Sequence, residues 1–99
     1  MSRLGARRMD RQAEELLDAL DEAEELLRRH DQAHWADWLA RGARDVRAGD
    51  FGGVEHVLRA FGGMGSISDV VLSTDDARLR RLLARVFDAA TELRRLQFH

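Results

Sequence analysis

The sequence predicts an all-α protein, and three observations support this fold class. Apolar residues recur at the three- and four-residue spacing of a helix face through most of the chain. No proline is present to interrupt a helix, so the eight glycines carry the backbone breaks. Hydrophobic residues make up 44% and charged residues 34% of the chain, a balance typical of a packed core under a solvated surface. We therefore expect a compact bundle of four main helices plus one short helix after a glycine-rich turn.

We expect all 99 residues to form one helical domain, in which residues 1–9 are a partly ordered N-terminal arm. The first helix is predicted over residues 10–29, with its acidic residues early and Arg28 and Arg29 last, an order that suits the helix dipole. Its apolar side carries Ala13, Leu16, Leu17, Leu20, Ala23 and Leu27. Asp31 should then cap the second helix.

The second helix is predicted over residues 33–48 and should end at Gly49. One stripe of it carries Trp35, Leu39, Gly42 and Val46, with Trp38 at the edge. We expect both tryptophans to lie in the core with an edge that reaches water. Asp50 is a natural N-cap for a short third helix that ends at Gly62. Its buried face should consist of Val54, Val57, Leu58 and Phe61.

Two capping-box patterns predict where the remaining helices begin. Ser66 and Asp69 have this spacing, which predicts one or two helical turns over residues 67–72. Ser73 and Asp76 repeat it before the last helix, predicted over residues 75–96. The apolar positions of the last helix are Leu79, Leu82, Leu83, Val86, Phe87, Ala90 and Leu93. So wide an apolar arc indicates packing against more than one neighbour.

Helix amphipathicity does not explain the glycine-rich segment, residues 61–69. In the interpretation that we favour, Gly63 and Gly65 turn the chain and Met64 fills the core. The alternative is a loop, residues 63–69, that binds a small ligand or an anion through its amides. The chain has no lysine and no preceding strand for a nucleotide loop, and the Asp69 carboxylate competes with an anion. The candidate partner or ligand surface comprises His56, Arg59, Gly63, Met64, Gly65, Ser66, Ser68 and Asp69.

No reaction centre is predicted from the remaining side chains. His30 and His34 have the spacing of a metal-binding pair, but a helix break is predicted between them and no third ligand is obvious. No nucleophile-elbow sequence surrounds any serine, and capping accounts for Ser66 and Ser73. We expect no catalytic residue, no cofactor and no metal, and we predict that the protein is not an enzyme.

Charge and composition exclude several partners. The net charge of −2 and the pI of about 6.1 lack the basic footprint of a nucleic-acid-binding domain. No apolar stretch has membrane-spanning length, and the arginine-rich start lacks the apolar run of a secretory signal. The absence of cysteine allows a reducing compartment. We therefore expect a cytoplasmic protein that binds neither nucleic acid nor membrane.

Acidic residues concentrate in the first predicted helix and arginines in the last. Between Asp10 and Glu25 there are eight acidic residues and one basic residue, Arg11. We favour the interpretation that the two helices lie together and complement each other in charge. The alternative is an acidic docking face formed by Glu14, Asp18, Asp21 and Glu25.

Residues 49–69 resemble a known family. Glu55-His56 and a hydrophobic run lead into Phe61-Gly-Gly-Met-Gly-Ser66, followed by Ile67-Ser68-Asp69. This segment is similar in sequence to a family of small, uncharacterised bacterial all-helical proteins, a domain of unknown function. Trp35-Ala-Asp-Trp-Leu39 is similar to the second helix of that family. The resemblance implies a bacterial helical domain and supplies no catalytic residues; many relatives are expected to have asparagine at the position of Ser68.

We predict a non-enzymatic protein–protein interaction module, immunity-like or regulatory in a bacterial conflict system. The small size, the acidic first helix and the lack of an assembled reaction centre motivate this prediction. The partner is expected to be another protein. The alternative is a small-ligand or anion-binding helical domain that uses residues 63–69. A homodimer through broad apolar faces of the second and last helices is a third hypothesis.

Overall fold

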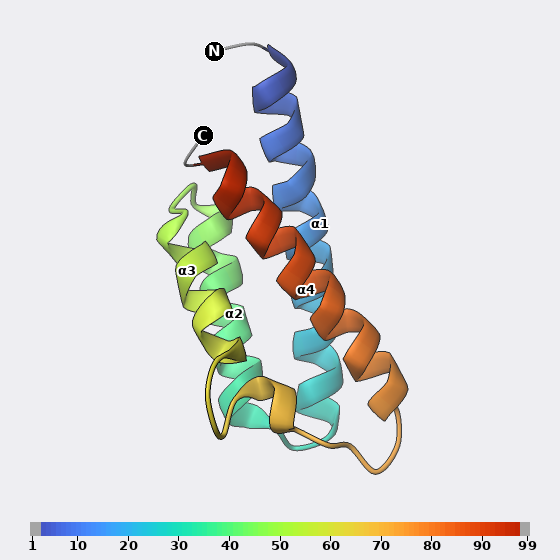
Figure 1. Cartoon of the computed structure of the whole chain (residues 1–99). Helices are drawn as coiled ribbons and strands as arrows, with labels where there is room; N and C mark the ends of the chain where they lie inside the picture. The colour runs from blue at the N-terminus through green and yellow to red at the C-terminus, as the bar shows by residue number, and fades with distance from the viewer. Residues whose placement is uncertain (1–2, 98–99) are drawn as a thin grey trace.

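The computed structural model describes residues 3–97 and is all-α in that part of the chain. Its helices are α1 (Arg3–Arg29), α2 (Ala33–Arg47), α3 (Gly52–Leu58) and α4 (Asp76–Gln97). Two single 3-10 turns, η1 (Arg59–Phe61) and η2 (Ile67–Asp69), follow α3 (Figure 1). The described residues contain no strand. The predicted fold class is therefore confirmed.

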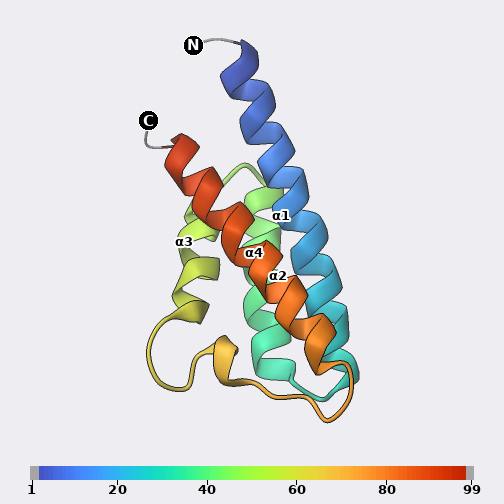
Figure 2. The ribbon, with the colours of Figure 1, turned by 45° about the vertical axis from the view of Figure 1, so that its right-hand side comes forward.

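The long helices α1 and α4 pack along each other, and α2 packs against α1 (Figures 1 and 2). The short α3 lies against α2 and α4, and η1 and η2 are in contact with each other. The described chain measures 46 × 22 × 21 Å, because the first turns of α1 extend past the ends of the other helices. Every helix thus has its apolar side on a shared core.

That core contains most of the predicted apolar positions. Leu16, Leu20, Leu27, Leu39, Val54, Val57, Leu79, Val86 and Leu93 are fully or almost fully buried. Trp35 and Trp38 are half-buried, as expected for tryptophans with one edge in water. Phe87 differs from its prediction, because 44% of it is exposed. It lies at the margin of the wide apolar arc of α4, where Phe61 of η1 covers only part of its ring.

Two predicted helix starts need correction. α1 begins at Arg3, so the predicted N-terminal arm is helical from that residue onward, while Met1 and Ser2 lie outside the described residues. Arginine, leucine, alanine and methionine are strong helix formers, and propagating an existing helix costs less than nucleating one. Asp31 does not cap α2: its φ of 59° places it in the left-handed region, and Gln32 is the N-cap. The tight turn after α1 needs such a residue, and aspartate tolerates this conformation.

The other predicted breaks agree closely with the structure. Gly49 ends α2 with a φ of 82°. The Asp50 side chain accepts a hydrogen bond from the amide of Gly52, the first residue of α3, at 2.9 Å, although Phe51 takes the N-cap position itself. α4 begins and ends one residue later than predicted.

Candidate functional site between η1, η2 and α4

The segment of residues 62–75 joins η1 to α4 across one end of the bundle (Figure 1). It contains little regular structure, and two apolar side chains fix it to the core. Ile67 is completely buried and Leu72 is 5% exposed. The segment is therefore an integral cover of the core and not a free loop.

Met64 is the clearest wrong prediction in this segment. Its side chain is 100% exposed, and Ile67 occupies the core in its place. Gly63 and Gly65 have φ values of 75° and 72°, which confirms their predicted role as turning residues. These two left-handed residues direct the tip of the turn, and with it Met64, into solvent.

The predicted cap at Ser66 forms, but the helix behind it is shorter than expected. The Ser66 Oγ accepts a hydrogen bond from the Ser68 amide at 3.2 Å, and the Asp69 carboxylate accepts one from the Gly65 amide at 2.9 Å. Helical structure stops at Asp69 instead of continuing to residue 72. The Asp76 carboxylate accepts a hydrogen bond from the Leu72 amide at 2.9 Å. This contact takes the place of the capping box that was predicted between Ser73 and Asp76. Contacts to α4 thus hold residues 70–72 away from a helical path.

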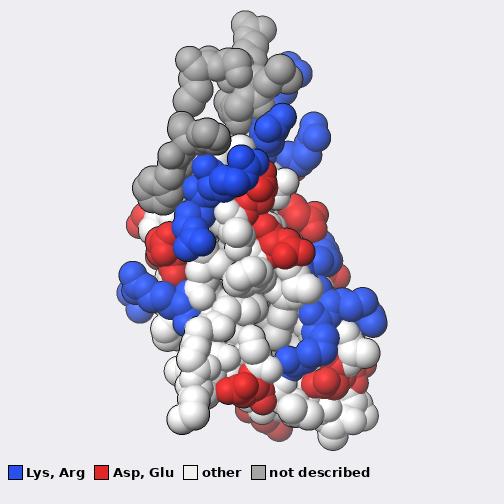
Figure 3. All heavy atoms as spheres, viewed as in Figure 1, with Lys and Arg blue, Asp and Glu red and all other residues white. Residues whose placement is uncertain are grey.

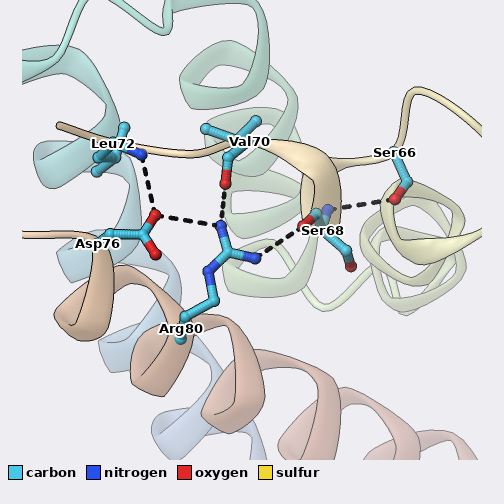
Figure 4. Close-up of polar contacts among 6 residues, drawn as sticks. All are labelled: Ser66, Ser68, Val70, Leu72, Asp76 and Arg80. Atoms are coloured by element: carbon cyan, nitrogen blue, oxygen red, sulfur yellow. Dashed lines mark hydrogen bonds and ion pairs between the residues drawn. The ribbon is translucent and has the colours of Figure 1, made fainter.

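Arg80 supplies the main contacts from α4 to this segment (Figure 4). Its Nη1 donates to the Ser68 carbonyl at 2.7 Å, and its Nη2 donates to the Val70 carbonyl. The guanidinium also pairs with Asp76 at 3.7 Å. Sequence reasoning missed this role, because an arginine on a helix gives no signal that it bonds backbone carbonyls of a distant turn.

Replacing Arg80 with alanine should lower the free energy of unfolding by about 1–2 kcal/mol, since it removes charge-assisted hydrogen bonds from a side chain that is only 39% exposed. Hydrogen exchange at the Ser68 and Leu72 amides should become faster than in the wild type. Arg59→Ala is the matched control, because Arg59 is exposed and forms no ion pair with a described residue. Equal exchange rates in the two variants would show that Arg80 does not hold the segment.

A surface recess of about 390 Å³ lies where η1, η2 and α4 meet. It is lined by Phe61, Ser68, Arg80, Leu83, Ala84, Phe87 and Asp88. The rings of Phe61 and Phe87 meet edge to face with their centroids 5.3 Å apart. Arg80 and Asp88 lie at opposite ends of the stretch of α4 that lines the recess. The recess thus combines aromatic walls with two charges of opposite sign.

Exposed apolar side chains also occur in the segment of residues 62–75 and on α4. Among the described residues, the large hydrophobics with high exposure are Met64 (100%), Val71 (78%) and Phe87 (44%). In Figure 3 an uncharged surface runs between α3 and α4, with arginines on both sides of it.

His56 and Arg59 do not join the glycine-rich segment in a shared site. His56 Nε2 lies 3.0 Å from the Trp38 carbonyl oxygen, and the Trp38 indole donates to the His56 carbonyl at 2.8 Å. Their rings stack with centroids 4.3 Å apart. His56 is half-buried, and these contacts link α3 to α2. Arg59 is exposed at the start of η1.

The charges of α1 and α4 complement each other as predicted. Arg85 of α4 bonds Glu15 and Glu22 of α1, each at 3.0 Å, and these carboxylates raise the pKa of its guanidinium. Asp21 pairs with Arg47 of α2. The other residues of the predicted acidic face, Glu14, Asp18 and Glu25, are exposed without an ion pair to any described residue.

The described side chains assemble no metal site. His30 lies at the end of α1 and pairs with Asp75 at 3.2 Å, while His34 lies beyond the turn in α2 against Trp35. Residues 3–97 contain no group of three or more histidine or carboxylate side chains placed to hold a metal ion. None of the helices in this part of the chain is both long and apolar enough to cross a bilayer.

The fold and its recess define a small all-α domain in which α4 and the two 3-10 turns form a hollow with aromatic walls. The chain belongs to the family described as a domain of unknown function (DUF6966), which it matches over residues 28–88. This match confirms the family resemblance drawn from the sequence. It includes every residue that lines the recess and excludes the predicted acidic face. Searches of the curated proteins and of the solved structures found no match.

Proposed function

We propose that this protein is a non-enzymatic module that binds another protein, and that the recess takes an apolar side chain of that partner. The observation that carries the proposal is the recess between Phe61 and Phe87, with a large exposed hydrophobic at its wall. Its volume of about 390 Å³ is enough for one or two large side chains. Aromatic-lined pockets that take an anchor side chain dominate the binding energy of many interfaces.

The charges around the recess determine which partners fit. Arg80 and Arg81 lie at one end of the contacting stretch of α4, and Asp88 lies at the other. These ends are about 12 Å apart at the rise of an α-helix. The fitting partner presents an apolar side chain between an acidic group, which faces the arginines, and a basic group, which faces Asp88. Such charge complementarity contributes more to the orientation of a complex than to its affinity.

Capture of partners from the native host tests the proposal. The wild type should retain a protein in stoichiometric amount, and Phe87→Asp and Ala84→Arg should lose it, because one charges the recess and the other fills it. Both positions are exposed, so unfolding midpoints close to that of the wild type should confirm that the variants fold. Asp18→Arg on α1 is the control and should retain the partner. If Asp18→Arg lost the partner and Phe87→Asp retained it, the predicted acidic face would be favoured as the binding surface instead.

The positions of the candidate catalytic groups support a role other than catalysis. Ser66 is buried and caps η2, while His56 is held by Trp38. A nucleophile and a base each occupied by structural hydrogen bonds are poorly placed to exchange a proton with substrate.

The alternative, an anion-binding loop at residues 63–69, receives less support. The amides that would hold an anion are occupied: that of Gly65 by Asp69 and that of Ser68 by Ser66. The carboxylate also adds a negative charge at that position. A rise in the unfolding midpoint with inorganic phosphate, nucleotides or small carboxylates would favour the alternative.

The narrower role that we propose, immunity-like or regulatory in a bacterial conflict system, rests on small size and on the absence of an assembled reaction centre from the described residues. The identity and the activity of the captured partner test this narrower role. A toxin-like enzyme that loses activity when bound supports the role, and a partner from primary metabolism contradicts it.

A further inference from the structure

We infer that a second copy of the chain binds this face, with the two α4 helices packed antiparallel. This inference rests on the proposed function, since it names a second copy of the chain as a protein that binds the same surface. It is argued from a short stripe of exposed residues on α4 whose charges find no partner within the described part of the chain.

Ion pairing along α4 is almost complete. The acidic residues Asp76 and Glu92 each pair with an arginine. Five arginines of the helix each pair with a carboxylate: Arg78, Arg80, Arg85, Arg94 and Arg95. Arg81 and Asp88 are the exceptions: both are exposed, and neither forms an ion pair with a described residue. They are the two charged positions of α4 that are available to another chain.

Arg81 and Asp88 lie on one face of α4 with Ala84 between them. The spacing of seven residues returns to the same side of the helix after two turns, about 10 Å further along its axis. All three residues are exposed. A second α4 that runs antiparallel across Ala84 reverses the order of the charges. Arg81 of each copy then faces Asp88 of the other, so one twofold contact forms two ion pairs.

The surface around this stripe suits a second helix. Ala84 is small, which lets two helix axes approach to about 8–10 Å. Phe87 is on the adjacent side, where the second copy would cover its exposed part. Hollows flank α4 on both sides: the recess, and a space of about 420 Å³ lined by Gln12, Glu15, Arg85, Asp88, Ala89 and Glu92. α4 therefore forms a ridge with room beside it for the side chains of a second α4.

The apolar contact provides the driving force, and the ion pairs select the orientation. A contact between single helix faces is smaller than the roughly 800 Å² per partner of a standard interface. A dimer that dissociates on dilution is therefore expected.

Sedimentation equilibrium over a dilution series tests the inference through charge reversal. The mass of the wild type should rise from 11.3 kDa toward twice that value as concentration increases. Arg81→Asp alone and Asp88→Arg alone should each weaken association by roughly tenfold or more, because each homodimer then places like charges opposite each other. An equimolar mixture of the two variants should recover association, since every facing pair again has opposite charges. The double variant Arg81→Asp/Asp88→Arg should also associate.

A monomeric wild type at all concentrations, or variants that associate as the wild type does, would overturn the inference. So would a mixture that associates no better than its components. The proposed function is tested separately: if the wild type is monomeric but captures another protein in a manner that depends on Phe87, the proposed function stands and this inference fails. A wild type that neither associates with itself nor captures another protein would refute both the inference and the proposed function.

Discussion

Replacing Ile67 with alanine is expected to lower the free energy of unfolding by about 3–4 kcal/mol, the typical cost of truncating a fully buried aliphatic side chain. Ile67 is completely buried and fixes residues 62–75 to the core. The loss therefore combines the transfer energy of the removed atoms with the cavity left beneath the segment. Urea unfolding followed by circular dichroism measures the change.

Met64→Ala is the control for this experiment. Met64 is three residues away in the same segment, yet its side chain is fully exposed. Its truncation should change the unfolding free energy by less than about 0.5 kcal/mol. A larger loss for Met64→Ala than for Ile67→Ala would restore the prediction that Met64 fills the core, and it would contradict the arrangement described above.

Replacing Gly53 with alanine is expected to cost about 2 kcal/mol, because α2 and α3 touch through backbone at this position. A Cβ on Gly53 would lie 2.7 Å from the Gly42 carbonyl oxygen and 2.9 Å from the Asp45 Cβ. The neighbouring atoms belong to α2, so the helices would have to separate. Overpacking of this kind costs about 1–3 kcal/mol. The gain in helix propensity, at most about 1 kcal/mol, offsets little of this cost in the first turn of α3.

Gly62→Ala provides the matched comparison for Gly53. Gly62 has a φ of −104°, which any residue adopts, and beyond its chain neighbours no atom lies within 4 Å of the position that an alanine methyl group would take. The stability of this variant should stay within about 0.5 kcal/mol of the wild type. If thermal and urea unfolding gave the two variants the same stability, α2 and α3 would not be in backbone contact.

The sequence predicts the helices well because each helix encodes its own buried face locally. Leu16, Leu20 and Leu27 recur at helical spacing whatever they pack against, and all are buried. The ability of glycine to adopt a positive φ is also a local property, so the turning roles of Gly49, Gly63 and Gly65 are predicted correctly.

Single side chains in the segment that follows η1 and on α4 are predicted less well, because tertiary contacts determine their roles. Met64 and Ile67 are both apolar in a stretch without periodicity, so no local pattern tells which of them is buried. Arg80 has the same sequence signature whether it is solvated or bonded to the Ser68 carbonyl. Phe87 fits the helical pattern of α4, yet the exposure of its ring depends on how far Phe61 of η1 extends over it.

The recess could not be predicted for the same reason. Its lining residues come from η1, from η2 and from residues 80–88 of α4, and no motif relates them. Of the predicted candidate surface, only Ser68 lines the recess. Charge patterning was more informative, since the acidic first helix and the basic last helix do form ion pairs.

Equilibrium titration of the captured partner protein against the wild type, Phe87→Asp and Asp18→Arg tests the proposed binding surface most directly. We predict that Phe87→Asp raises the dissociation constant by more than about tenfold, the effect expected of a buried anchor contact. Asp18→Arg should change it by less than about twofold, as is typical of a charge outside the interface. A dissociation constant that is unchanged by Phe87→Asp and raised by Asp18→Arg would contradict the assignment of the binding surface to the recess.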